Sequence, residues 1–229
     1  MSHDFGDSVI KSVYEQNPNS EAAVAIYKNF HHFSKLYDAT GGNFIYGCGS
    51  YMFDGVTYRY MDATFRKQET LFNAGKEAKT ALEVGVYLGH SLLILLLSNP
   101  TLKITCIDND ARYSPKVVDY LNTHFGNRIT LLIGNALDVL PMLPPTSYDL
   151  IHVDADHEVP AVTQQFTMCK VLAKPSATVV FDDYDATKPL IDSFMETGQL
   201  IHVVTPDCLW RNCVTRTPAV AAAAGAIQN

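Results

Sequence analysis

Four apolar segments of the sequence each end in one or two acidic residues. These acids are Glu83, Asp108, Asp154 and the pair Asp182-Asp183. If the segments are neighbouring parallel strands, their carboxyl ends lie at one edge of a sheet, where open α/β sheets bind ligands. Converging carboxylates repel one another unless they bind hydroxyl groups, a positively charged group or a metal ion. The set therefore predicts a ligand site, although any one of these acids alone is more readily explained as a helix cap.

A glycine-containing turn follows the first of these acids. Gly85 and Gly89 lie four residues apart, and the apolar stretch 92–97 comes after them, so the order is strand, turn and helix. Gly85 permits a tight turn and a close approach to a ligand, and Gly89 permits close packing at the helix start. Ser91 lies in the first helical turn, where free N–H groups attract an anion such as a carboxylate. The turn by itself is equally compatible with an ordinary strand-to-helix connection.

The spacing of Asp108 indicates a nucleoside cofactor. This residue lies 108 − 89 = 19 positions after Gly89, about where such folds place the acid that binds the ribose hydroxyls. A nicotinamide dinucleotide and S-adenosylmethionine are both candidates. Glu83, two residues before Gly85, disfavours a pyrophosphate and favours the cationic methionine end, and the turn departs from the G-x-G-x-x-G spacing. The balance favours S-adenosylmethionine.

Strands that alternate with helices must position these residues. The expected strands are residues 80–83, 102–107, 128–133, 148–153, 177–181, 199–204 and 209–215. The expected helices are 21–37, 61–78, the one that opens at the glycine turn, 114–125, 135–143, 158–172 and 186–197. This alternation is typical of a parallel sheet with helices on both faces. His152 falls within a strand and is expected to be a core residue.

Residues 41–60 alternate glycines with aromatic residues and show no regular period. A loop of this length inside a compact domain is usually functional or mobile. Its rings could cover a flat substrate, and they could equally form a dimer contact or a packed arm. Both interpretations stay open.

Composition excludes several classes of protein. The formal net charge of −7 disfavours a nucleic-acid partner, which requires a basic surface. No apolar run approaches the length of about 18 residues that spans a membrane. Five scattered cysteines suit reduced thiols better than a disulfide framework, and the polar N-terminus resembles no signal peptide. We therefore expect a cytoplasmic protein.

Residues 81–184 resemble the class I methyltransferases, in particular the metal-dependent small-molecule O-methyltransferases of the catechol type and their relatives that act on sugars and macrolides. Four motifs carry the resemblance: Gly85-Val86-Tyr87-Leu88-Gly89-His90-Ser91, the turn at 134–141, Val153-Asp154-Ala155-Asp156-His157, and Phe181-Asp182-Asp183-Tyr184. The resemblance implies a Rossmann-like class I methyltransferase fold, with a mainly parallel seven-stranded α/β sheet whose last strand is antiparallel. It divides the chain into a helical and Gly/aromatic cap segment (1–78), a methyltransferase domain (79–217) and a disordered tail (218–229).

The resemblance also implies roles for individual residues. The cofactor-binding residues would be Glu83, Gly85, Tyr87, Gly89, Ser91, Asp108, Asn109, Asn135, Ala136 and Asp154. Asp154, Asp182 and Asp183 would bind Mg²⁺ or a similar divalent cation, whose preferred ligands are hard oxygens. Asp154 and His157 would be catalytic, with His157 as the base that receives the acceptor's proton. Asp183 stands where catechol enzymes have asparagine and His157 where they have lysine, and both changes occur among sugar and macrolide O-methyltransferases.

The sequence thus predicts an S-adenosylmethionine-dependent O-methyltransferase for a small hydroxylated molecule, with a possible homodimer through the N-terminal segment and no membrane or nucleic-acid partner. Two alternatives stay open. A hydroxylase-like or otherwise non-methylating relative could have kept the cofactor pocket. A cofactor-binding subunit could instead use the Gly/aromatic segment for assembly.

Overall fold

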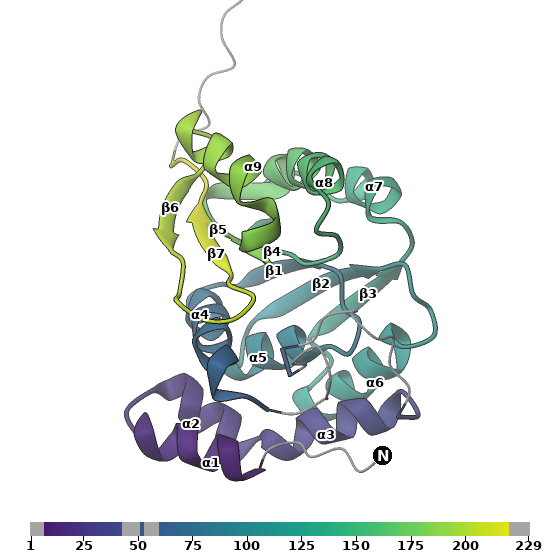
Figure 1. Ribbon diagram of the computed structural model, residues 1–229. Helices are drawn as coiled ribbons and strands as arrows, with labels where there is room; N and C mark the ends of the chain where they lie inside the picture. Colours follow the sequence, from purple (N-terminus) through teal and green to yellow (C-terminus); the bar gives the residue numbers. More distant parts are fainter. Residues whose placement is uncertain (1–6, 43–50, 53–59, 220–229) are drawn as a thin grey trace, which may run out of the picture.

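A seven-stranded sheet forms the centre of the part of the chain that the computed structural model describes, residues 7–42, 51–52 and 60–219 (Figure 1). Its strands are β1 (Thr80–Val84), β2 (Lys103–Asp108), β3 (Ile129–Ile133), β4 (Tyr148–Val153), β5 (Ala173–Phe181), β6 (Ile201–Val204) and β7 (Cys213–Arg216). Their order is β3-β2-β1-β4-β5-β7-β6, with β1 to β5 parallel and β7 antiparallel to both of its neighbours. The predicted fold class is confirmed.

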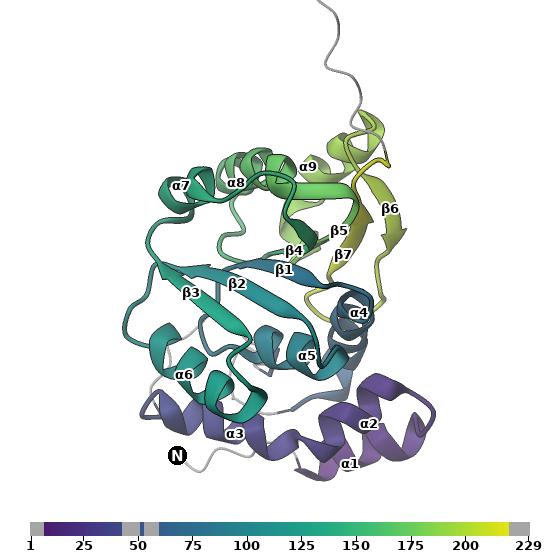
Figure 2. The same cartoon turned by 180° about the vertical axis from the view of Figure 1, so that it is seen from behind.

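Helices cover both faces of this sheet, as Figures 1 and 2 show. One face carries α4 (Phe65–Gly75), α5 (His90–Ser98) and α6 (Ser114–Phe125), and the other carries α7 (Ala136–Val139), α8 (Val159–Leu172) and α9 (Tyr184–Glu196). Short 3₁₀ turns at Asp62–Thr64 and Leu140–Met142 complete these connections. Two hydrophobic cores result, one on each face of the sheet.

Helix α5 is apolar all round, and the architecture explains why. Its residues from Leu92 to Leu96 are buried between the sheet and a further layer of helices. That layer consists of α1 (Asp7–Gln16), α2 (Glu21–Lys28) and α3 (Phe30–Ala39), which lie outside α5 and α6 (Figure 1). Among the described residues, no helix is both long enough and apolar enough to cross a membrane.

The structure corrects several expected boundaries. The single helix expected over 21–37 is wrong, because the chain leaves helical geometry at Asn29, whose side chain donates to the Ala25 carbonyl and competes with the backbone. Helix α1 was not expected, and the helix expected over 61–78 is shorter. Ser20 caps α2, since its hydroxyl accepts from the Ala23 amide.

The Gly/aromatic segment lies mostly outside the described residues, which omit 43–50 and 53–59, and the expected tail is described only to residue 219. Within the segment, Tyr51, Met52 and Tyr60 are buried. The proposed roles of the remainder stay predictions, as does the division of the chain at residue 78.

Candidate active site

A cavity of about 750 Å³ opens at the carboxyl ends of the parallel strands. Every cofactor, metal and catalytic residue expected from the sequence lines it, with the exception of Glu83. Glu83 is fully buried near the end of β1, and its side chain contacts Ser91, which does line the cavity. The strand-end acids therefore converge on one edge of the sheet.

The turn after β1 requires glycine at two positions. Gly85 has a φ of 98°, and a Cβ atom there would lie 2.4 Å from the Asp154 carbonyl oxygen. Gly89 has a φ of 67°, and its Cβ would lie 2.2 Å from Cγ1 of Val117 on α6. Gly85 thus permits close approach to the residue after β4, and Gly89 permits close approach to α6. These two contacts hold the turn between β4 and α6.

Asp108 holds this turn in place. Its Oδ2 accepts hydrogen bonds from the backbone amides of Val86 and Tyr87, each at 2.8 Å. Its Oδ1 accepts from the Asp110 amide at 2.6 Å. A carboxylate has about four acceptor sites, so one remains for a ligand hydroxyl. The residue expected to bind ribose therefore also orders the cofactor turn, a role that spacing alone did not indicate.

The buried carboxylate of Glu83 is only partly hydrogen-bonded. Its Oε1 accepts a hydrogen bond from the Ser91 hydroxyl on α5. Its Oε2 is buried without a hydrogen bond from the described residues, and the nearest ionisable partner is Nδ1 of His152 at 3.6 Å. A buried carboxylate oxygen without a donor is costly. This arrangement fits a ligand that brings a cationic donor, such as the amino group of a methionine.

The residues expected to flank the adenine lie just after β3. The Asn135 side chain accepts from the Leu137 amide at 2.8 Å and caps α7. The Gly134 amide donates to the Asp108 carbonyl, which places this turn beside the acid expected to bind the ribose. Asn135, Ala136 and Asn109 all line this part of the cavity.

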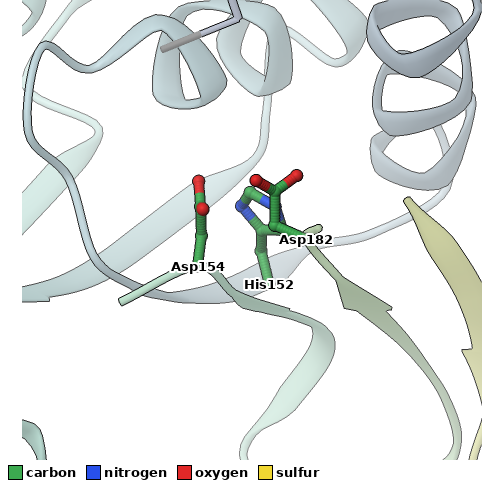
Figure 3. Close-up of side chains that lie close together, drawn as sticks. All are labelled: His152, Asp154 and Asp182. Carbon is green, nitrogen blue, oxygen red and sulfur yellow. The ribbon is translucent and has the colours of Figure 1, made fainter. Parts of the chain in front are cut away.

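Acidic side chains gather on the other side of the cavity, at the ends of β4 and β5. Figure 3 shows His152, Asp154 and Asp182 pointing the same way from these neighbouring strands. Each offers one possible ligand atom, and these atoms lie within 4.8 Å of one another. His152 is buried, as expected for a core residue, but it also belongs to this cluster. Asp183 lies at the N-terminus of α9 with a φ of 43°.

Lys67 on α4 supplies a positive charge to this cluster. Its Nζ lies 2.7 Å from Oδ1 and 2.9 Å from Oδ2 of Asp182, and 3.5 Å from Oδ1 of Asp183. Burial alone would raise the pKa of Asp182, but the ammonium group holds it below its usual value. Burial and the Asp182 charge raise the pKa of Asp154 well above its usual value. Opposite shifts at neighbouring carboxyls make Asp154 the better proton carrier of the two.

His157 lies at the mouth of the cavity. Its Nε2 is 3.7 Å from Oδ2 of Asp183, and both side chains are partly exposed. The preceding Asp156 accepts from the Glu158 amide at 2.8 Å, in the turn that leads into α8. His157 is therefore accessible to a ligand and lies beside an acid.

The family comparison decides the class of this domain. Residues 82–184 match the model of a family described as a methyltransferase domain. The chain carries a methyltransferase domain. The match begins in β1 and ends at the start of α9, so it contains every strand-end acid of the cavity.

Solved structures share the fold of this methyltransferase domain. The O-methyltransferase TomG from Streptomyces achromogenes, in complex with SAM, is 18% identical with a TM-score of 0.62, covering 86% of this chain and 96% of its own. The Bacillus cereus O-methyltransferase, in complex with SAH, is 14% identical with a TM-score of 0.61, covering 85% and 97%. The N-methyltransferase NodS from Bradyrhizobium japonicum is 16% identical with a TM-score of 0.55, covering 68% and 97%. No curated protein matches the chain. The class I methyltransferase fold expected from the sequence is confirmed, and the family match covers residues 82–184 as a methyltransferase domain.

Sequence reasoning did not assign Lys67, Tyr51 or Trp210 to the site, although all three line the cavity. Lys67 lies on the same buried face of α4 as Leu71, four residues on, and a charged residue on that face was a signal that could have been used. Tyr51 was marked only as part of the Gly/aromatic segment; its hydroxyl lies 3.1 Å from Nε2 of His152 and donates to Asp182 at 3.5 Å. Trp210 lies in the β6–β7 connection, because the strand expected over 209–215 begins only at Cys213.

Proposed function

We propose that the protein transfers the methyl group of S-adenosylmethionine to an oxygen atom of a small hydroxylated molecule. The unsatisfied Oε2 of the buried Glu83 carries the cofactor half of the proposal, because it needs a cationic donor at the glycine turn. The O-methyltransferases of the same fold, with SAM or SAH bound, support it.

The cofactor would lie along the turn and across the ends of β1, β2 and β3. Glu83 and Ser91 would hold its methionine end, together with Tyr87. The remaining acceptor site of Asp108, with Asn109, would bind the ribose, and Asn135 and Ala136 would flank the adenine. When bound, the sulfonium supplies an electrophilic methyl group and leaves as S-adenosylhomocysteine.

The acceptor would enter beside Asp154 and His157. Its hydroxyl oxygen forms the new bond to the methyl carbon while the carbon–sulfur bond breaks, and the hydroxyl proton passes to His157. Asp183, 3.7 Å from His157, orients the ring and stabilises the imidazolium that results. Asp154 holds the acceptor by a hydrogen bond, and positioning of the two substrates supplies most of the rate enhancement.

A divalent cation at Asp154, Asp182 and Asp183 would lower the pKa of the acceptor hydroxyl. The described residues do not fit this ion as they stand. Lys67 already places its ammonium group 2.7 Å from Asp182 and 3.5 Å from Asp183. His152, a nitrogen ligand, completes the group of atoms that lie close enough to share an ion, whereas Mg²⁺ prefers oxygen. We therefore route no step through a metal.

The test is an assay of product and by-product. The full chain is incubated with S-adenosylmethionine and a panel of catechols, flavonoids, sugars and matching amines, and mass spectrometry follows methylated product and S-adenosylhomocysteine. We expect methylated hydroxyl compounds, and a His157→Ala variant that loses roughly 10²–10⁴-fold in kcat. Methylation confined to amines would contradict the oxygen assignment, and turnover unchanged in His157→Ala would remove that residue from the mechanism.

The cytoplasmic location, the homodimer and the absence of a nucleic-acid partner stay predictions.

A further inference from the structure

We propose that Lys67 is the resident cation of the acidic cluster, and that the protein therefore neither binds nor requires a divalent ion there. The proposal concerns the acceptor side of the proposed function, and only its consequence for turnover rests on that function. Ion binding itself can be measured whether or not the protein transfers methyl groups.

The contacts of the ammonium group carry the argument. Nζ of Lys67 approaches both oxygens of Asp182 at 2.7 and 2.9 Å, which is hydrogen-bond distance, and one oxygen of Asp183 at 3.5 Å. The side chains of Lys67 and Asp182 are only 5% and 7% exposed. Two of the three carboxylates expected to bind metal are thus already paired with a buried positive charge.

A metal ion would compete with the ammonium group for these carboxylates. Mg²⁺ binds carboxylate oxygens at about 2.0–2.1 Å and Ca²⁺ at about 2.3–2.6 Å. An ion at that distance from the same Asp182 oxygens would take the hydrogen-bond positions that Lys67 uses, and would lie against a like charge in a buried site. Binding would require Lys67 to leave.

The surroundings of Lys67 hold both its ammonium group and its helix in place. Its ammonium group lies 4.7 Å from the centre of the Tyr51 ring, in a cation–π contact. Its backbone carbonyl accepts from the Asn212 side chain, and the adjacent Gln68 side chain donates to the Tyr51 carbonyl at 3.0 Å. The first turn of α4 is thereby fixed against the strand ends from two sides.

Lys67 also contributes to the charge balance of the cluster. Its ammonium group pairs with Asp182 and Asp183, two of the three carboxylates, and so offsets part of the negative charge that an ion would otherwise have to neutralise.

Titration with Mn²⁺, followed by the electron paramagnetic resonance signal of the free ion, tests the proposal. The wild-type full chain should leave the signal of millimolar Mn²⁺ unchanged. Lys67→Met, which frees the carboxylates, should bind Mn²⁺ with a Kd lower than that of wild type by roughly tenfold or more. Lys67→Arg keeps the charge and should resemble wild type. Lys76→Met at the end of the same helix, whose ammonium pairs with Glu21 away from the cavity, is the matched control.

Wild-type binding of Mn²⁺ that Asp182→Asn abolishes would overturn the proposal. So would a folded Lys67→Met variant that binds no better than wild type. If Lys67→Met does not fold, the wild-type and Lys67→Arg titrations decide the question by themselves. Calorimetry with S-adenosylmethionine on the same samples separates the two proposals: failure to bind the cofactor would refute the proposed function and leave the assignment of Lys67 untouched. Where turnover is found, it should persist in a metal chelator.

Discussion

Replacement of Lys67 by methionine should destabilise the fold strongly. Methionine preserves most of the side-chain volume on α4 but leaves Asp182, only 7% exposed, beside two other carboxyls without its ammonium partner. Removal of one member of a buried ion pair typically costs about 3–5 kcal/mol. For a chain of this length, each kcal/mol lowers Tm by roughly 2–4 °C, so the midpoint should fall by roughly 6–20 °C.

The assay is urea-induced unfolding followed by circular dichroism, with Asp182→Asn and the double variant measured beside it. Because Asp182→Asn removes the charge that Lys67→Met leaves unpaired, the double variant should recover about 1–3 kcal/mol relative to the sum of the single changes. Lys76→Met breaks a pair whose side chains are 31% and 73% exposed, and should cost less than about 1 kcal/mol. A Lys67→Met cost similar to that of Lys76→Met, or strict additivity in the double variant, would refute the assignment of Lys67 as a buried ionic partner.

Two further changes test the turn and the start of α5. Gly85→Ala should destabilise the protein by more than Gly126→Ala. A Cβ atom at Gly126 would meet no atom within 4 Å, so that variant bears only the strain of a left-handed backbone, roughly 1–2 kcal/mol. Equal losses of unfolding free energy in urea would contradict the packing at Gly85. Burial lowers the pKa of His90 to about 3, so the unfolded chain binds the extra proton as pH falls below about 6.5. Between pH 7 and 4.5, wild type should therefore lose up to about 3 kcal/mol more stability than His90→Gln.

The alternation of strands and helices, and the acids at the strand ends, could be predicted because both depend on local patterns. Apolar runs that end in Glu83, Asp108 and Asp154 mark β1, β2 and β4, and parallel pairing necessarily brings those ends to one edge. The glycine turn could also be predicted locally, because the structure leaves no room for a side chain at Gly85 or Gly89.

The pairing of Lys67 with Asp182 could not be predicted in this way. Its partner Asp182 lies 115 positions away in the sequence, and only the packing of α4 beside the end of β5 brings the two together. The acids predicted a divalent metal, and the structure places the Lys67 ammonium group against two of them, because a metal and a lysine satisfy the same pattern of carboxylates. The helix break at Asn29 could not be predicted for a related reason. A side-chain hydrogen bond ends α2 there, and the hydrophobic period of the sequence does not change.

Calorimetric titration of S-adenosylmethionine into wild type and Glu83→Gln tests the central claim most directly. Wild type should bind the cofactor, and the variant should lose a charge-assisted hydrogen bond worth about 1.5–3 kcal/mol, a loss of roughly 10–150-fold in Kd. Glu77→Gln, at an exposed position, should bind as wild type does. Absence of binding to wild type, or equal affinity in Glu83→Gln, would contradict the assignment of the buried Glu83 oxygen to the methionine amino group.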